Sequence, residues 1–168
     1  MSESTIHVEN GWALYAHPFF VQRLEELTSE VERALDRDPE GFHHHPSFKL
    51  LEAIAQNIFV NVPSNPDSPS FRQGKTLGKT RGYWRRVKKQ GMNPRYRLFF
   101  QFRSEAPKTI IYVWINDQDS IRKAGSKTDV YSVFAAKLEK GIIPESFADL
   151  LAACHPLDKD KWQGGAEE

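Results

Sequence analysis

Residues 71–103 read FRQGKTLGKTRGYWRRVKKQGMNPRYRLFFQFR, and this stretch differs from the rest of the chain in its charge. It contains eleven Lys or Arg residues and neither Asp nor Glu, whereas the whole chain of 168 residues has 23 basic and 22 acidic residues. The net charge of +1 is therefore the sum of +11 in this segment and −10 in the rest of the chain. A purely solvating surface usually mixes both signs. The asymmetry instead indicates a site for a polyanion, most commonly a nucleic acid.

The end of this stretch, RYRLFFQFR at residues 95–103, alternates between apolar and polar side chains. One face carries Tyr96, Leu98, Phe100 and Phe102, and the other carries Arg95, Arg97, Phe99, Gln101 and Arg103. A period of two predicts a strand whose apolar side faces a core. The basic side chains are then held on a rigid sheet rather than on a mobile tail.

Two further strands are predicted beside this one. Residues 109–115 (TIIYVWI) are apolar on both faces, which is typical of a central strand. Residues 83–88 (YWRRVK) form a shorter strand, in which Arg86 and Lys88 share a face. The turn residues at 91–94 and 105–108 suit hairpin connections between the three strands.

Helical periodicity appears on both sides of the basic stretch. A first helix begins near Pro18, has apolar positions at Phe20, Leu24, Leu27, Val31 and Leu35, and ends at residues 38–41 (DPEG). A second begins at Pro46, with Phe48, Leu51, Ala55 and Ile58 on one stripe and Leu50 and Ile54 beside it. The two helices are expected to form a hairpin over one face of the sheet. The remaining elements are a short strand at 11–16, a helix with Val130, Phe134 and Leu138 that ends near Gly141, and a short helix within 144–154.

Bulk properties place the chain among globular proteins of a reducing compartment. Cys154 is the single cysteine, so no internal disulfide forms, and no apolar run has the length of a membrane span. The first residues, MSESTIHVEN, lack the apolar core of a signal peptide, so a cytoplasmic location is expected. We expect a loose polar lead over 1–10, one domain over 1–154 and a flexible tail over 155–168.

Two motifs are rejected as sites. The GKT triplets at 74–76 and 78–80 lack the earlier glycine of a phosphate-binding loop, because position 69 is Pro and position 73 is Gln. They belong to a long loop, residues 61–82, that is expected to be functional or mobile. Three adjacent histidines at 43–45 cannot all point at one ion, so no metal site is predicted.

The basic stretch lacks a carboxylate cluster for Mg²⁺ and is rich in Arg and Lys, a composition with which RNA can be cleaved without a metal ion. In principle the ribose 2′-OH attacks the adjacent phosphate, while the enzyme removes one proton, stabilises charge and supplies another proton. Arginine provides fork-shaped donors for phosphate oxygens. Lys88 is a candidate base, because neighbouring cations disfavour a protonated amine.

The ordered set of elements resembles the RelE/ParE superfamily of bacterial toxins and, within it, the YhaV family. The residues that carry the resemblance are 11–18 (GWALYAHP), 71–78 (FRQGKTLG), 95–100 (RYRLFF), 114–117 (WIND) and 125–134 (GSKTDVYSVF). It implies an α+β, RelE-like fold: an N-terminal helical hairpin packed on a small, twisted, mostly antiparallel sheet, with C-terminal helices.

The resemblance also implies a function and its residues. The function is a toxin of a type II toxin–antitoxin system that cuts mRNA on the ribosome as an endoribonuclease. The implied partner is a PrlF-type antitoxin with an AbrB-like DNA-binding domain, and operator DNA is contacted only through that antitoxin. The implied catalytic positions fall at Arg86, Lys88, Arg97, Lys127 and Tyr131. The expected RNA-binding residues are Arg72, Lys75, Lys79, Arg81, Arg85, Lys89, Arg95 and Arg122.

Within this set, Arg86 and Arg97 are expected to bind phosphate and stabilise transition-state charge, Lys88 to act as base or stabilise charge, and Tyr131 to act as base or stack on a nucleobase. No cofactor or metal is expected. Two alternatives stay open: a non-catalytic RNA- or ribosome-binding module using the same residues, and, less favoured, a gyrase-directed toxin.

Overall fold

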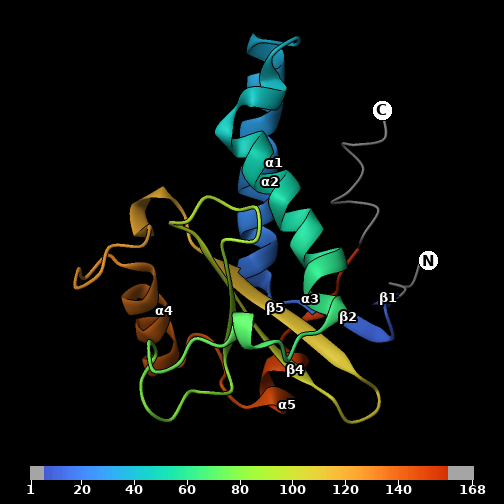
Figure 1. Cartoon of the computed structure of the whole chain (residues 1–168), viewed down its shortest axis with the longest axis vertical. Helices are drawn as coiled ribbons and strands as arrows, with labels where there is room; N and C mark the ends of the chain where they lie inside the picture. The colour runs from blue at the N-terminus through green and yellow to red at the C-terminus, as the bar shows by residue number, and fades with distance from the viewer. Residues whose placement is uncertain (1–5, 159–168) are drawn as a thin grey trace.

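A computed structural model describes residues 6–158 (Figure 1). Its strands are β1 (His7–Glu9), β2 (Trp12–Ala16), β3 (Arg85–Lys88), β4 (Arg97–Arg103), β5 (Thr109–Ile115) and β6 (His155–Pro156). Its helices are α1 (Pro18–Arg37), α2 (Pro46–Gln56), α3 (Val62–Ser64), α4 (Val130–Glu139) and α5 (Phe147–Ala152). The fold is α+β, as the sequence predicted. Among residues 6–158, no helix is long and apolar enough to cross a membrane.

The strands form one mixed sheet in the order β1-β2-β5-β4-β3, with β6 also paired to β2. Only β2 and β5 run parallel; the other pairs are antiparallel. All seven residues of β5 are buried, which confirms the prediction of a central strand. The β4–β5 ladder shifts register between Phe99 and Phe100, but apolar side chains still alternate between the two sheet faces.

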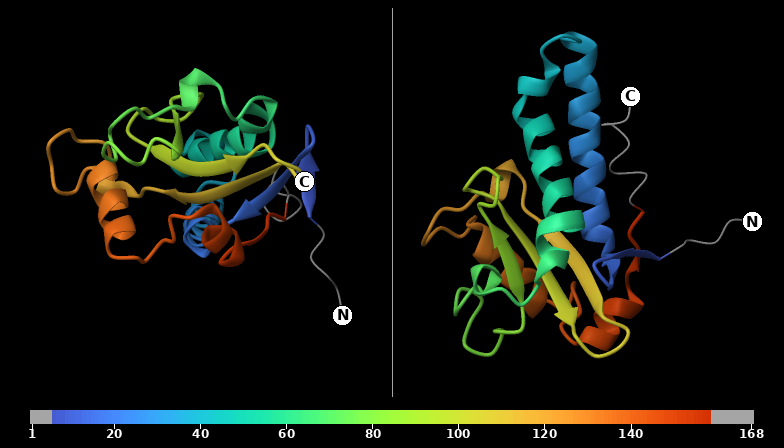
Figure 2. Two further views of the ribbon diagram at one scale, coloured as in Figure 1. Left: turned by 90° about the horizontal axis from the view of Figure 1, so that it is seen from below. Right: turned by 45° about the vertical axis from the view of Figure 1, so that its right-hand side comes forward.

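One face of the sheet is covered by α1 and α2, which run side by side (Figure 2). Leu24 and Ile54 from these helices share a core with Leu98 and Phe100 of β4. His17 caps α1 by accepting a hydrogen bond from the Phe19 amide, and Pro18 occupies the first turn. The paired helices extend past the sheet, so Leu35 near their far end is 41% exposed.

The opposite face is covered by the C-terminal helices rather than left as an open basic surface. The ring of Phe99 in β4 stacks on Phe134 of α4 at a centroid distance of 4.1 Å, and Trp114 of β5 stacks on the same ring at 5.9 Å. Leu150 of α5 belongs to this second core. The polar side chain of Arg97 on the same face is therefore only 4% exposed.

Several boundaries differ from those read in the sequence. Strand β3 begins at Arg85, because Tyr83 and Gly82 form a turn. The second helix continues from α2 through a π-helical turn, Asn57–Asn61, into α3. Of the apolar positions that the sequence placed on this helix, Leu50, Ile54 and Ile58 are buried, whereas Phe48 and Leu51 are only half-buried.

Both ends of the described chain contain more structure than predicted. In the supposed polar lead, β1 pairs with β2, and in the supposed tail, β6 pairs with β2 while Leu157 is buried at 1% exposure. The periodicity of side chains along one segment does not predict which other segment it pairs with, so neither pairing was expected. Residues 1–5 and 159–168, the rest of those two predicted segments, lie outside the described residues.

Candidate functional site

Two predicted catalytic arginines donate hydrogen bonds to the phenolic oxygen of Tyr131. It accepts one hydrogen bond from Arg86 Nε at 3.1 Å and another from Arg97 Nε at 3.0 Å. The guanidinium of Arg122 lies over the face of the Tyr131 ring, 5.0 Å from its centroid. We call Arg86, Arg97, Arg122 and Tyr131 the Tyr131 cluster.

Three elements bring the cluster together. In the β3–β4 ladder, Arg86 pairs with Phe99 and Lys88 pairs with Arg97, so these four side chains occupy one sheet face. Helix α4 packs on this face through the Phe99–Phe134 stack and delivers Tyr131 from its first turn. The structure therefore brings together residues that lie 45 positions apart in the chain.

The segment before α4 is held by Asp129, a residue whose role sequence reasoning missed. Its carboxylate caps α4 by accepting from the Tyr131 amide at 3.0 Å, accepts from Arg122 Nη1 at 2.7 Å, and accepts from the Lys123 amide. Burial alone would raise the pKa of this carboxyl. The hydrogen bonds from Arg122 and the two amides outweigh burial and place the pKa below its usual value. The signal in the sequence was an Asp directly before a predicted helix.

Asn116 is a second residue that the sequence reading missed. Its fully buried side chain accepts from the Arg97 amide at 2.9 Å and donates to the carbonyls of Arg95 and Ser120. The Arg122 amide also donates to the Arg95 carbonyl. These bonds fasten the segment after β5 to the start of β4, so Arg122 stays beside Arg97.

The other two predicted catalytic lysines differ in their surroundings. Lys88 is exposed and lies on the face of Arg86 and Arg97, next to the cluster. Lys127 is also exposed and belongs to the segment before Asp129. Its side chain forms no hydrogen bond or ion pair with any of residues 6–158, so the structure does not tie it to Tyr131.

The remaining basic residues do not form one patch. Arg81 is engaged by Glu145, with Nε–Oε1 at 2.9 Å, and Arg85 lies on the opposite sheet face, where its Nη2 is 3.3 Å from Asp67. Arg72 also reaches Asp67, at 3.6 Å. The expected RNA contacts that stay exposed without such an acidic partner among the described residues are Lys75, Lys79, Lys89 and Arg95.

The loop with the two GKT triplets is ordered by the side chain of Gln73. This 4%-exposed amide donates to the Arg81 carbonyl at 2.7 Å and accepts from the Thr76 hydroxyl and the Leu77 amide. The loop therefore presents Lys75 and Lys79 on a defined frame instead of cradling a phosphate with its glycines.

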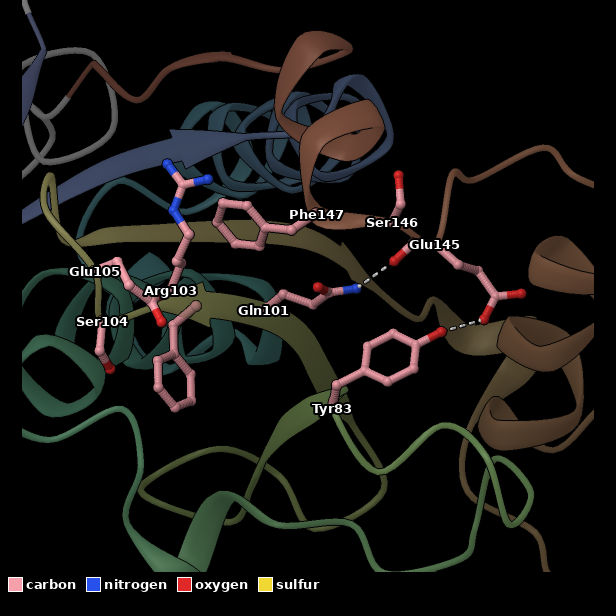
Figure 3. Close-up of a pocket in the computed structure, with 9 residues that line it drawn as sticks. Tyr83, Gln101, Arg103, Ser104, Glu105, Glu145, Ser146 and Phe147 are labelled. Atoms are coloured by element: carbon pink, nitrogen blue, oxygen red, sulfur yellow. Dashed lines mark hydrogen bonds between the residues drawn. The ribbon is translucent and has the colours of Figure 1, made fainter.

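A shallow depression of about 650 Å³ lies further along the same sheet face, beside α5 (Figure 3). It is lined by Tyr83, Gln101, Phe102, Arg103, Ser104, Glu105, Glu145, Ser146 and Phe147. None of the predicted catalytic residues borders it. Within residues 6–158, no group of three or more His, Cys, Asp or Glu side chains is placed to hold a metal ion.

The hydrogen bonds of the cluster limit what each group does chemically. A phenolic oxygen has two acceptor positions and one proton. Because Arg86 and Arg97 occupy the acceptor positions of Tyr131, the group that remains is the O–H proton, which is suited to a phosphate or a leaving oxygen. Arg97 also donates through Nη1 to the carbonyls of Pro94 and Tyr96, so it orients the phenol more than it reaches outward.

The ring of Tyr131 is less suited to stacking on a base than the sequence reading allowed. It is 6% exposed, it meets Phe99 edge-on at 5.8 Å, and Arg122 and Arg97 lie against it. A nucleobase would have to displace Arg122 to reach the ring.

Comparisons with known proteins agree on one family. A family model described as a toxin with endonuclease activity, of toxin–antitoxin system, matches residues 14–155. The toxin YhaV of Escherichia coli O6:H1 is 43% identical over 142 residues, covering 84% of this chain and 90% of that toxin. The ribonuclease toxin YhaV of E. coli strain K12 matches with the same identity and coverage. No solved structure matches significantly. The matched range includes every residue of the Tyr131 cluster. Because the family model and these relatives cover most of the chain, the chain belongs to the YhaV family of toxins with endonuclease activity.

Proposed function

We propose that this toxin cuts mRNA at the Tyr131 cluster by attack of a ribose 2′-OH on the adjacent phosphate. The observation that carries the proposal is the meeting of two guanidinium groups at one phenol, beside an exposed lysine on the same sheet face. This set supplies positive charge, a proton donor and a candidate base, which are the requirements for phosphate displacement by an internal hydroxyl. The name of the K12 relative, a ribonuclease, supports RNA as the substrate.

Each member of the set receives a role that its surroundings support. Lys88 is exposed and takes the proton of the attacking 2′-OH. Tyr131 donates its proton toward the leaving 5′-oxygen, because its acceptor positions are occupied by arginines. Arg86 and Arg122, which are half-buried, stabilise the charge that develops on the phosphate, and Arg97 holds the phenol. Lys127 is a further charge contact for the RNA.

The overall shape supports a RelE-like arrangement. Paired N-terminal helices cover one face of a mostly antiparallel sheet, and the cluster lies on the other face beside α4. The proposed RNA contacts are Arg122 within the cluster and the exposed residues Lys75, Lys79, Lys89 and Arg95, whereas Arg72, Arg81 and Arg85 are paired with acidic side chains of the protein itself.

Membership of a toxin–antitoxin family implies an antitoxin. We infer that it is of the PrlF type, with an AbrB-like domain that alone contacts operator DNA, and that it presents acidic or strand-edge contacts to this basic face in the cytoplasm. A complex that leaves Arg86, Lys88 and Arg97 fully open would contradict this inference. We also propose that the toxin acts on mRNA held by the ribosome.

The decisive experiment follows cleavage and binding separately. Lys88→Ala is expected to lower single-turnover cleavage of RNA by about 10²–10⁴-fold, the usual cost of losing a general base, while the dissociation constant changes much less. Cleavage is expected to persist in EDTA. Lys140→Ala, an exposed lysine beyond α4, is the matched control and should cleave as the unmodified protein does.

Other outcomes point to the two remaining readings. If purified toxin binds ribosomes or RNA but leaves mRNA ends unchanged under translation, it is a binding module. If cells expressing it show DNA damage without loss of RNA, its target is gyrase. If Lys88→Ala alters affinity alone, Lys88 is not the base, and Tyr131 is the next candidate.

A further inference from the structure

The ring of Tyr83 is exposed but firmly held at one side of the depression in Figure 3. It is 44% exposed, and its hydroxyl donates to Glu145 Oε1 at 2.7 Å. Glu145 is in turn held by Arg81 Nε at 2.9 Å and Nη2 at 3.4 Å. Burial and the hydrogen bond to Glu145 raise the pKa of Tyr83 to about 12, so the ring stays neutral. A fixed, neutral, exposed ring binds a flat partner with little loss of its own freedom.

A second flat surface lies across the depression. The guanidinium of Arg103 stacks over the Phe147 ring at 4.7 Å from its centroid, and Figure 3 shows Gln101 between this pair and Tyr83. The Gln101 amide donates to the Glu145 carbonyl at 3.2 Å, which fixes the floor. Ser104 and Ser146 also line the depression, and the Ser146 hydroxyl accepts a hydrogen bond from the Asp149 amide.

The charges and size of the depression select among parts of an RNA chain. Glu105 and Glu145 line it together with Arg103, and Arg81 pairs with Glu145, so the depression has no excess of positive charge to hold a phosphate. Its volume of about 650 Å³ falls in the ordinary range for small-ligand sites. Aromatic rings and arginine planes stack on nucleobases of any sequence, and hydroxyls recognise base edges. The side chains that line the depression are therefore better suited to a nucleobase than to the phosphate backbone of RNA.

The depression and the Tyr131 cluster lie along one face of β4, but Phe99 and Phe134 fill that face between them, so an RNA strand that joins the two sites runs along the edge strand β3. Tyr83 precedes Arg86 by three residues, and Gln101 follows Arg97 by four residues on β4. At about 3.3 Å per strand residue, the two sites lie roughly 10–15 Å apart, a distance that a short single strand covers. The exposed lysines of the GKT loop, Lys75 and Lys79, precede Tyr83 by eight and four residues in the chain.

We propose that this depression is a subsite for one unpaired nucleobase of the substrate RNA, a few nucleotides from the cut bond. The proposal rests on the RNA cleavage proposed above and deepens it, because a base held here sets where the strand is cut relative to the Tyr131 cluster.

The test combines protein variants with abasic substitutions in a single-stranded RNA that carries a mapped cut. One abasic position is expected to lower kcat/KM of the unmodified toxin on the order of 10-fold, as loss of one base stack does. Tyr83→Ala is expected to lower cleavage of the intact RNA by a similar factor and to be insensitive to that same abasic position. Tyr83→Phe keeps the ring and should stay within about threefold. Ile142→Ala, which removes another exposed apolar side chain outside the depression, is the control.

Two results would overturn the subsite. The first is a loss of cleavage on Tyr83→Ala by one common factor for every abasic RNA, which is the signature of general damage, and the second is no effect of Tyr83→Ala at all. Repeating the abasic scan as a binding measurement, on RNA with 2′-O-methyl riboses that cannot be cut, separates the two proposals. If RNA binding depends on Tyr83 and on one base while the toxin never cleaves RNA, the subsite is supported and the proposed cleavage is wrong.

Discussion

The Tyr131 hydroxyl satisfies two buried or half-buried guanidinium groups as well as offering a proton. Tyr131→Phe removes that oxygen, so Arg86 and Arg97 lose a shared acceptor and the site loses its proposed proton donor. We expect cleavage to fall by about 10²–10⁴-fold while RNA affinity changes little. Pre-steady-state cleavage with an RNA carrying a better leaving group at the 5′-oxygen is the measurement. If that activated RNA does not recover the lost rate, Tyr131 is not the proton donor.

Asp129 offers a test of positioning, because one carboxylate holds both Arg122 and the first turn of α4. Asp129→Asn keeps an oxygen for the Tyr131 amide but loses the ion pair. We expect about 1–3 kcal/mol less stability near neutral pH and slower cleavage. The double variant with Arg122→Gln should cleave no more slowly than Arg122→Gln alone. Additive rate losses would show that Asp129 does not act through Arg122.

The same residue gives a pH dependence with a defined sign. The pKa of Asp129 in the folded protein lies below its usual value, so its stabilising effect is present above about pH 4 and is lost as pH falls through the folded pKa. The stability difference between the unmodified protein and Asp129→Asn is therefore expected to shrink in acid. Denaturant unfolding at a series of pH values measures this difference. A gap that widens toward acid would contradict the assigned cause.

Sequence reasoning located the charged segment but could not sort its residues. Arg85 and Arg86 are neighbours of one type, yet strand alternation directs one to Asp67 and the other to Tyr131. Arg81 is paired with Glu145, 64 positions away. Such partners are set by tertiary packing. The charge composition of the segment therefore cannot distinguish an arginine that pairs within the fold from one that is available to RNA.

Among the elements, α4 has two functions, since it closes the second core and carries Tyr131. The ring of Phe134 is parallel to the cross-strand neighbours Phe99 and Trp114, with interplanar angles of 2° and 5°, and stacks on both. Phe134→Ala is expected to cost about 3–5 kcal/mol of unfolding free energy, because it empties a fully buried site. Chemical denaturation checks the cost. Ile142→Ala at an exposed site should change stability far less, and equal losses would mean that α4 does not form this core.

The sequence predicted elements where periodicity was strong and local. Strand β5 agrees with its apolar pattern throughout, and helix α1 agrees at Phe20, Leu24 and Leu27, because each pattern reports burial along one segment. Leu35 is exposed because that end of α1 extends past the sheet. The short strands β1 and β6 escaped notice, since two or three residues carry no period and their pairing depends on β2. The covering of the basic face by α4 was also invisible, because an apolar helix stripe does not specify which sheet face it meets.

For the whole molecule, the arrangement of charge predicts the salt dependence of RNA binding. Each phosphate neutralised by a lysine or arginine releases counterions, so affinity should fall steeply and linearly on logarithmic axes as salt rises. Lys75→Gln combined with Lys79→Gln should reduce the slope by roughly 1–2 for a single strand. Fluorescence anisotropy over a salt series measures it. A flat affinity would exclude the backbone as the main contact.

The parallel pairing of β2 with β5 has a consequence for the order of events during synthesis. Ala13 pairs with Thr109, so the second strand made must wait for nearly a hundred further residues before its central neighbour exists. The phenol at position 131 and the β6 partner of β2 emerge later still. A nascent chain that still lacks position 131 therefore cannot assemble the proposed catalytic centre, and pairings between such distant segments form slowly. During that interval the nascent toxin is therefore unable to cut RNA by the route proposed above.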